Sequence, residues 1–217
     1  MYKSTDGGTT WANASASVGS KNWSLARTLS GSNTIKVKVS DAAGNDGSIT
    51  SKSYVLDTTA TQAPLLSSLG GEVDDQYLNN SEANAGLELR VNLPSSGVLP
   101  VAGDRVELLL GGISFSTAKV ITLTAQDITA GYVGFSVHKS DWGSDGSKSL
   151  SAIVTDIAGN ASDASDALAF TLDTTAPSNT VATIALSADS GTDGDFVTNS
   201  AAQDISGTLS ANLAANE

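Results

Sequence analysis

A five-residue motif, Asp-x-Ala-Gly-Asn, occurs twice in the chain, at residues 41–45 and 156–160. Carboxylate and amide oxygens are ligands that Ca²⁺ prefers in proteins. The Gly lets the backbone bend tightly, so that carbonyl oxygens can join the ligand shell. Each copy is therefore a candidate part of a calcium site. The alternative is a plain tight turn in which the Asp side chain accepts hydrogen bonds from its own backbone.

Two further groups of acidic residues lie in segments that are typical of loops. They consist of Asp189, Asp193 and Asp195, and of Asp74 and Asp75 beside Asn79 or Asn80. Neither group follows the EF-hand pattern or a tandem glycine-rich calcium repeat. Each is a second candidate metal site, with a solvated acidic turn as the alternative. The segment 141–145 is predicted to be a plain turn.

The residues give little support for catalysis. The chain has no Cys, and its single His, His138, continues the outward side of a predicted strand. Thiol catalysis and cysteine zinc sites are excluded by count. Paired carboxylates for glycoside hydrolysis stay open, but the Asp residues lie in turns and not in an apolar cleft. We expect no enzymatic activity, no catalytic residue and no bound organic cofactor.

Three Trp residues could instead form a platform on which a sugar stacks. We prefer packing in a core or hairpin for Trp11 and Trp23. Trp142 is then the residue on which a carbohydrate-binding function would depend.

The net charge limits the partners. The 217 residues include 11 Lys and Arg and 23 Asp and Glu, for a formal net charge of −12. Nucleic acids and anionic membranes are poor partners for such a chain, because both require a basic face. No apolar run has the length of a membrane span, so no membrane insertion is expected.

Alternating apolar residues predict short strands at 35–39, 133–137 and 168–172. Further strands are expected at 87–93, 105–110, 119–124, 150–155 and 181–187, and one short helical turn at 81–86. Clusters of Gly, Asn, Asp and Ser separate the strands at the spacing of an antiparallel sandwich.

The two acidic turns belong to a longer internal repeat. Each is followed by a strand and by a Leu-Asp-Thr-Thr-Ala linker, and equivalent residues are 115 or 116 positions apart. Such self-similarity indicates tandem domains. We predict the C-terminal part of a domain at 1–57, a complete domain at 58–176 and the N-terminal part of a further domain at 177–217. The predicted fold class is all-β, with tandem immunoglobulin-like antiparallel β-sandwich domains arranged end to end.

This topology orders the acidic residues. The last two strands of a sandwich run antiparallel, so the Asp-x-Ala-Gly-Asn turn lies at the opposite end of its domain from the linker Asp. In domains stacked end to end, Asp57 should approach Asp156 and Asn160. Asp104 precedes a strand at the same end and is a third candidate ligand.

The second linker has the same predicted geometry. Asp173 should face the turn of a following domain, whose equivalent in this chain is Asp41 with Asn45. Carboxylates that converge on one junction repel each other unless a cation joins them. Ca²⁺ takes six to eight oxygen ligands and suits such a place. Binding there would order the linker and stiffen the chain.

The paired motifs resemble the bacterial Ig-like repeats of giant surface adhesins that are exported by type I secretion, the RTX and biofilm-associated group. The resemblance rests on Asp-x-Ala-Gly-Asn followed by LDTTAP, and on the segments STDGGTTW, YLNNSEA and AGDRVELLL. The first linker departs from the pattern, with TTATQAP in place of TTAP. The resemblance implies an extracellular β-sandwich rod at the bacterial cell surface, often rigidified by Ca²⁺, which holds an adhesive tip away from the cell.

The expected function is therefore that of a non-enzymatic extender or spacer in cell adhesion, whose partners are neighbouring repeats. Two alternatives remain. One is a carbohydrate-binding module of an adhesin, and the other is an accessory sandwich domain of a secreted polysaccharide-degrading enzyme.

The predicted part-domains also suggest self-association. A half sandwich exposes sheet edges and apolar faces. Residues 177–217 of one molecule could complete residues 1–57 of another. Such a contact joins two different surfaces and would give head-to-tail chains or rings.

Overall fold

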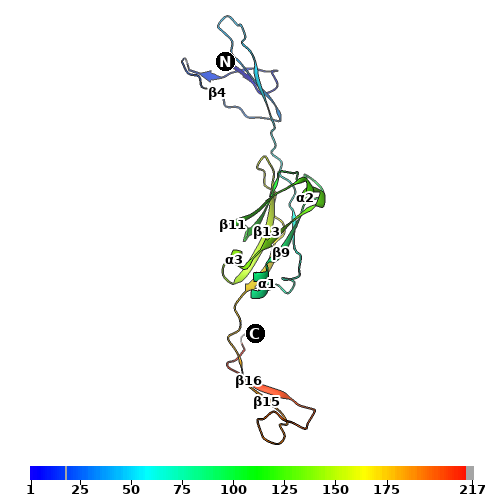
Figure 1. Cartoon of the computed structure of the whole chain (residues 1–217). Coiled ribbons are helices and arrows are strands. Elements are labelled where there is room, and N and C mark those ends of the chain that lie inside the picture. Colours follow the sequence, from blue (N-terminus) through cyan, green and yellow to red (C-terminus); the bar gives the residue numbers. More distant parts are fainter. Residues whose placement is uncertain (18, 214–217) are drawn as a thin grey trace.

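The computed structural model describes residues 1–17 and 19–213. Figure 1 shows three units that follow one another along one long axis. We call them the N-terminal sheet (β1 to β6), the central sandwich (β7 to β14) and the C-terminal hairpin (β15 and β16). Among the described residues, no helix has both the length and the apolar character needed to cross a lipid bilayer.

The N-terminal sheet has four strands in the order β2-β1-β5-β6. A separate two-stranded pair, β3 with β4, lies between β2 and β5 in the sequence. The strands are β1 (Tyr2–Ser4), β2 (Ala12–Asn13), β3 (Ser15–Ala16), β4 (Trp23–Ser24), β5 (Asn33–Lys38) and β6 (Thr50–Tyr54). A tight turn connects β1 and β2, and Gly7 and Gly8 both adopt positive φ there.

The central sandwich consists of two sheets. The larger has the order β11-β10-β13-β14-β8, and the smaller has the order β12-β9-β7. Neighbouring strands are antiparallel except for β8 and β14, which run parallel. The strands are β7 (Leu65–Ser68), β8 (Tyr77–Asn79), β9 (Leu87–Asn92), β10 (Arg105–Leu110), β11 (Ile113–Thr122), β12 (Tyr132–Val137), β13 (Gly146–Thr155) and β14 (Leu168–Asp173). Two facing antiparallel sheets of this kind form an immunoglobulin-like sandwich.

Three short helices connect these strands: α1 (Asn80–Ala85), α2 (Ala125–Ala130) and α3 (Lys139–Trp142). Asn79 caps α1, and its side chain accepts hydrogen bonds from the first turn of the helix. Thr124 and Asp127 form the same reciprocal arrangement at the start of α2. A capping box satisfies backbone N–H groups that a helix leaves unpaired.

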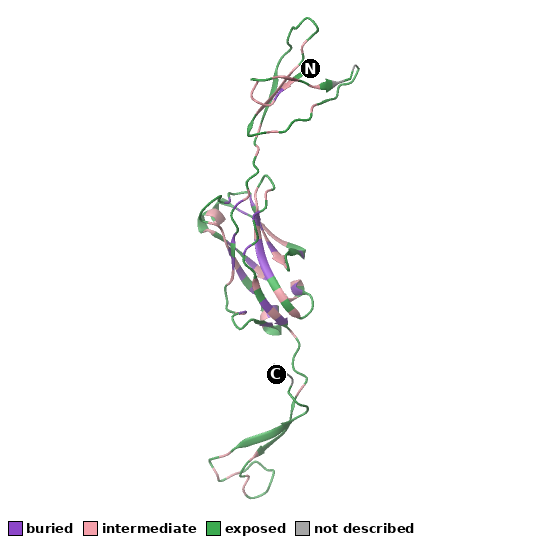
Figure 2. Ribbon diagram, turned by 180° about the vertical axis from the view of Figure 1, so that it is seen from behind, coloured by how far each residue is buried: buried purple, intermediate pink, exposed green. Residues whose placement is uncertain are grey.

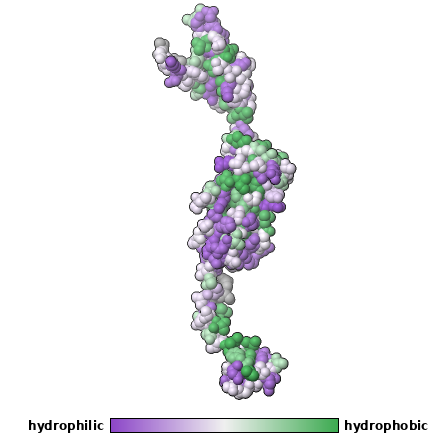
Figure 3. All heavy atoms as spheres, viewed as in Figure 1, coloured by the Kyte–Doolittle hydropathy of each residue, from purple (hydrophilic) through white to green (hydrophobic). Residues whose placement is uncertain are grey.

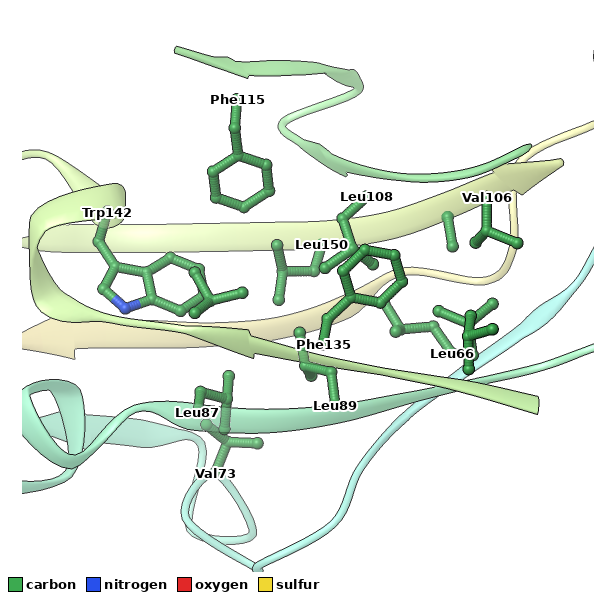
Figure 4. Packing of buried hydrophobic residues seen from close by; sticks show 14 of the residues in the cluster. Leu66, Val73, Leu87, Leu89, Val106, Leu108, Phe115, Phe135, Trp142 and Leu150 are labelled. Atoms are coloured by element: carbon green, nitrogen blue, oxygen red, sulfur yellow. The ribbon is translucent and has the colours of Figure 1, made fainter. Parts of the chain in front are cut away.

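One hydrophobic core fills the central sandwich. Its buried apolar residues all lie between Leu66 and Leu172 and come from both sheets. Figure 2 shows that the buried part of the chain is concentrated in this unit, and Figure 4 shows how its side chains meet between the sheets. Burial of each Leu or Phe side chain contributes about 1.5–3 kcal/mol.

The C-terminal hairpin pairs β15 (Val181–Leu186) with β16 (Ile205–Leu209). Its apolar side chains are largely exposed, unlike those of the sandwich. It forms a two-stranded sheet of its own. A two-stranded hairpin is at best marginally stable in water without a partner surface.

The predicted fold class, all-β with immunoglobulin-like antiparallel sandwiches, is confirmed. Each predicted strand is present, although β11 and β13 begin earlier than the alternation indicates. The expectation of only one helical turn is wrong, because α2 and α3 are also present. Both are too short to display a helical period in the sequence. The predicted domain boundaries stay a prediction.

Candidate functional site at the first linker

The two Asp-x-Ala-Gly-Asn turns have the same hydrogen-bond pattern. In the second, the Asp156 carboxylate accepts the backbone N–H and the side-chain amide of Asn160, both at 2.8 Å. In the first, Asp41 accepts the same two groups of Asn45, again at 2.8 Å. The Gly of each turn has a φ near 95°, which other residues adopt only with strain. Each carboxylate is thus bonded within its own turn, as the plain-turn alternative requires.

These bonds stabilise the charged form of each carboxyl. The side-chain amide of Asn160 is the main cause that lowers the pKa of Asp156, and the amide of Asn45 does the same for the pKa of Asp41. Both carboxylates therefore stay ionised at pH values where an ordinary Asp begins to take up a proton.

The first linker contacts the second of these turns. The side-chain amide of Asn160 donates to the backbone carbonyl of Asp57 at 3.2 Å. The carboxylate of Asp57 accepts the N–H of Thr59 at 3.0 Å, within the linker itself. The predicted approach of Asp57 to the 156–160 turn is therefore present, and its first contact is made by a backbone oxygen.

A cavity of about 490 Å³ lies at this junction. Asp57, Asp104 and Asp156 line it, together with apolar residues of the linker and of the loop before β10. Three of the candidate ligands thus line one space.

Asp104 is the buried member of the group, with 1% of its surface exposed. Its Oδ2 accepts the N–H of Val101 at 2.8 Å, and its Oδ1 accepts the N–H of Ile157 at 3.1 Å. The side chain therefore ties the loop before β10 to the second acidic turn. A buried carboxylate with two such donors has a structural role in the sandwich whether or not a cation binds.

The donor chemistry suits Ca²⁺, because the available groups are carboxylate, amide and carbonyl oxygens. A carboxylate oxygen that accepts one hydrogen bond keeps a further lone pair. Within residues 1–17 and 19–213, however, no group of three or more His, Cys, Asp or Glu side chains is arranged to hold a metal ion. The junction thus has the right ligand types without a preassembled ligand cluster.

The second linker repeats the geometry of the first. The carboxylate of Asp173 accepts the N–H of Thr175 at 3.1 Å, as Asp57 does from Thr59. Asp173 is the last residue of β14. This strand finishes at the end of the sandwich that is opposite to the N-terminal sheet (Figure 1). Its predicted partners, Asp41 and Asn45, belong to that sheet, so one chain does not bring the three together.

Asp145 has a role that sequence reasoning missed. Its carboxylate accepts the N–H of Thr174 at 3.0 Å, the hydroxyl of Thr174 at 2.8 Å and the hydroxyl of Thr175 at 2.9 Å. These bonds lower the pKa of Asp145, with the backbone N–H of Thr174 as the main cause. The loop predicted as a plain turn therefore holds the second linker.

Two buried serines near the second turn were also missed. The hydroxyl oxygens of Ser162 and Ser165 accept the backbone N–H groups of Val154 and Ala152, each at 3.0 Å. The two hydroxyls give acceptors to backbone N–H groups in the last part of β13, beyond the residues of that strand that pair with β14. Their three-residue spacing in a polar segment gives no alternation from which this pairing could be read.

The other two acidic groups fit the acidic-turn alternative. Asp189 accepts the N–H groups of Gly194 and Phe196, and Asp195 accepts the N–H of Val197. Asp193 is exposed, and one buried oxygen of Asp189 has no hydrogen-bond partner. In the second group, Asp75 accepts the N–H of Tyr77, Asn79 caps α1, and Asn80 accepts Lys139; Asp74 is exposed.

Trp142 is not placed to form a sugar platform. Trp142 has 2% of its surface exposed, and its ring makes edge contacts with Phe115 and Phe170 in the core. The carbohydrate alternative loses the residue on which it depended, because α3 turns that side chain inward. His138 is exposed at the start of α3, as its strand position predicts.

No family model matches the chain, and no curated protein matches it. Several solved structures do resemble it. Among them are bacterial adhesins. A Ca²⁺-stabilised, ice-binding adhesin of an Antarctic bacterium is 25% identical over 73% of this chain, with a TM-score of 0.39. A bacterial immunoglobulin-like domain of the M. primoryensis ice-binding adhesin is 21% identical over 53% of this chain and all of its own, with a TM-score of 0.35.

A tetra-tandem repeat from the extending region of a large adhesion protein is 22% identical to this chain. That match covers 87% of this chain and 43% of the other, with a TM-score of 0.33. The chain spans 35% of the Antarctic adhesin structure. These proteins are of the kind that the repeated motifs resemble.

Proposed function

We propose that the protein is a non-enzymatic extender segment of a bacterial cell-surface adhesin. It lies outside the cell and holds an adhesive region away from the surface, and its partners are the neighbouring Ig-like repeats. The observation that carries this proposal is the contact between Asn160 and the Asp57 carbonyl. It joins a linker to the turn of the next unit, in a chain whose units follow one another along one axis (Figure 1).

The repetition of this geometry supports the same role. Both turns have one hydrogen-bond pattern, and both linkers have an Asp that accepts the N–H two residues on. A segment that joins unit to unit in one repeated way sets a spacing, which is what an extender requires. The comparisons with adhesins, one of them with an extending region, agree with this role.

We further propose that Ca²⁺ stiffens the first linker. Asp57, Asp104, Asp156 and Asn160 would hold the ion through carboxylate and amide oxygens around their shared cavity. When bound, the ion neutralises the carboxylates and fixes the linker against the turn. Extracellular modules bind Ca²⁺ with dissociation constants of roughly 10⁻⁴–10⁻³ M.

A thermal melt in EDTA, Mg²⁺ and Ca²⁺ tests the calcium proposal. We expect Ca²⁺, and not Mg²⁺, to raise the Tm, because a ligand at 100 times its dissociation constant adds about 2.7 kcal/mol to stability. Asp57→Ala should remove most of the shift. Asp163→Ala, at an exposed position away from the cavity, is the matched control and should keep it. Equal Tm values in all three solutions would contradict the calcium proposal and leave the extender function without a bound ion.

A further inference from the structure

The hydroxyl of Thr61 is buried without a hydrogen-bond partner. The residue has 6% of its surface exposed, and its Oγ1 makes no hydrogen bond with any described residue. A buried polar group that is left unpaired costs free energy, so such groups are rare and call for an explanation. Thr61 stands four positions after Asp57 in the first linker, where the second linker has Pro177 four positions after Asp173. Of the two linkers, the first alone has this hydroxyl.

Thr61 lines the cavity at the first linker, together with Asp57, Asp104 and Asp156. Thr59 also lines the cavity, but it is exposed to water. The other lining residues are apolar. Figure 3 shows hydrophobic residues at the surface in this part of the molecule, where the first linker joins the central sandwich. Among the described residues that line the cavity, Thr61 therefore supplies the one buried, uncharged side-chain oxygen.

The loop before β10 holds both Thr61 and Asp104 at this cavity. The N–H of Gln62, the residue after Thr61, donates to the carbonyl of Val98 in that loop at 3.1 Å. Asp104 closes the same loop, because its carboxylate accepts the N–H of Val101 at 2.8 Å. The hydroxyl and the buried carboxylate are thus attached to one short segment by separate hydrogen bonds.

No basic residue offsets the carboxylates at the cavity. Three of the described residues that line it are acidic, and none of them is Lys, Arg or His. Asp104 and Asp156 accept backbone N–H groups, which are dipoles and leave the net charge unchanged. Like charges around one space repel each other unless a cation lies between them. The surplus of negative charge favours a cation as the occupant, and oxygen ligands favour a hard divalent one.

We propose that the hydroxyl oxygen of Thr61 is a further ligand of the Ca²⁺ at the first linker, beside Asp57, Asp104 and Asp156. This inference rests on the proposed calcium binding. A hydroxyl oxygen has two lone pairs, and Ca²⁺ takes uncharged as well as charged oxygens to complete its six to eight ligands. The ion gives the hydroxyl the partner that it lacks in the structure. Burial of this group is then favourable only when the ion is bound.

Thr61→Val tests the role of the hydroxyl, because it replaces the hydroxyl with a methyl group and keeps all three carboxylates. In EDTA, the variant should be at least as stable as the original chain, since the hydroxyl makes no hydrogen bond there. In Ca²⁺, the variant should melt at a lower temperature than the original chain. A decrease in Tm that is the same in EDTA and in Ca²⁺ would indicate a structural role for the hydroxyl and would overturn the proposal.

An NMR titration of the whole chain with Ca²⁺ measures binding at this site alone. The signals to follow are the backbone amides of residues 57–61 and 156–160. Thr61→Val should raise the dissociation constant by about tenfold, which corresponds to about 1.4 kcal/mol. Thr61→Ser keeps the hydroxyl and should bind more tightly than Thr61→Val. Thr58→Val, at an exposed position of the same linker that does not line the cavity, is the matched control and should bind as the original chain does.

The outcomes separate this inference from the calcium proposal. Equal dissociation constants for the original chain and Thr61→Val would refute the role of Thr61 and leave the carboxylates as ligands. Binding by Thr61→Ser that is no tighter than binding by Thr61→Val would also contradict it. If Ca²⁺ shifts none of these amide signals in the original chain, the calcium proposal fails and the role of Thr61 fails with it.

Discussion

Asn160 connects the 156–160 turn to the first linker. Its amide group reaches both the carboxylate of Asp156 and the backbone of Asp57. Asn45 makes the first of these contacts in its own turn. Asn45 and Asn160 share the turn bonds, and Asn160 also contacts the first linker, so comparing them separates the role of the turn from that of the junction.

Asn160→Ala should raise the pKa of Asp156 toward its ordinary value, because its main stabilising donor is gone. A carboxyl with a lowered folded pKa adds stability above its unfolded pKa, and this is lost as the pH falls through the folded pKa. The variant should therefore have a lower free energy of unfolding at pH 7. When the pH falls below 4, it should lose less of this free energy than the original chain does. NMR titration of Asp156 and denaturant melts at pH 7 and 3 measure this.

The matched control is Asn45→Ala. It removes the same turn bonds in the N-terminal sheet and should leave the unfolding of the central sandwich unchanged. An equal effect of both variants on that transition would show that contact with the linker is not what distinguishes Asn160.

Ser162→Ala should destabilise the sandwich by about 1–3 kcal/mol, because the buried N–H of Val154 loses its side-chain acceptor. Chemical denaturation followed by Trp fluorescence measures the change. Ser149→Ala, on the exposed side of the same strand, should cost little. If the two variants unfold at the same denaturant concentration, the hydroxyl of Ser162 is not needed by β13.

At the scale of elements, helix α3 anchors the core from the edge of the sandwich. It has four residues, and the backbone N–H of His138 and the Lys119 ammonium both bind the carboxylate of Asp141. That arrangement holds Trp142 between Phe115 and Phe170. A short element thus determines the position of the largest buried side chain.

Trp142→Ala should lower the free energy of unfolding by about 3–5 kcal/mol, because it leaves a large cavity in a close-packed core. Trp23→Ala is the control, since that ring is 41% exposed and lies outside the core cluster. Calorimetry of both variants checks the difference. A Trp142 variant as stable as the original chain would contradict the core role.

The sequence patterns predict most of the strands, because alternation of apolar and polar residues is visible over five or more positions. They miss α2 and α3 and the strands β3, β4, β7 and β8, which are too short to show a period. The approach of Asp57 to the second turn follows from topology alone. The roles of Asp145 and Ser162 do not, because each depends on backbone groups far away in sequence that no side-chain pattern marks.

At the scale of the whole molecule, the direction of each linker depends on a few hydrogen bonds. The first linker is held by Asn160 and the second by Asp145. Short extended segments connect the three units of the chain (Figure 1). The N–H of Gln62 also donates to the carbonyl of Val98 and holds the first linker. We therefore expect Asn160 and Asp145 to influence the direction of the linkers.

Asp145→Ala should widen the range of angles at the second linker, because Thr174 and Thr175 lose their shared acceptor. Small-angle X-ray scattering of dilute protein should show a smaller maximum dimension, and amide exchange at residues 174–175 should become faster. Asp166→Ala, at an exposed position away from the linker, should change neither. Unchanged scattering and exchange in the Asp145 variant would mean that the linker is held by other contacts.

The parallel pairing of β8 and β14 matters when the chain is under tension. The strand β7 precedes β8 and pairs with β9, so a pull on the N-terminal side reaches β8 once β7 has separated, and it then draws β8 toward its start. A pull on the C-terminal side draws β14 toward its end. Because the strands are parallel, with Tyr77 beside Thr171 and Asn79 beside Asp173, the two pulls oppose each other along the strand axis. The hydrogen bonds between them are loaded in shear, all at once, and not peeled apart one after another. A sandwich connected in this way should resist the pull of fluid flow on the chain until the hydrogen bonds between β8 and β14 break together.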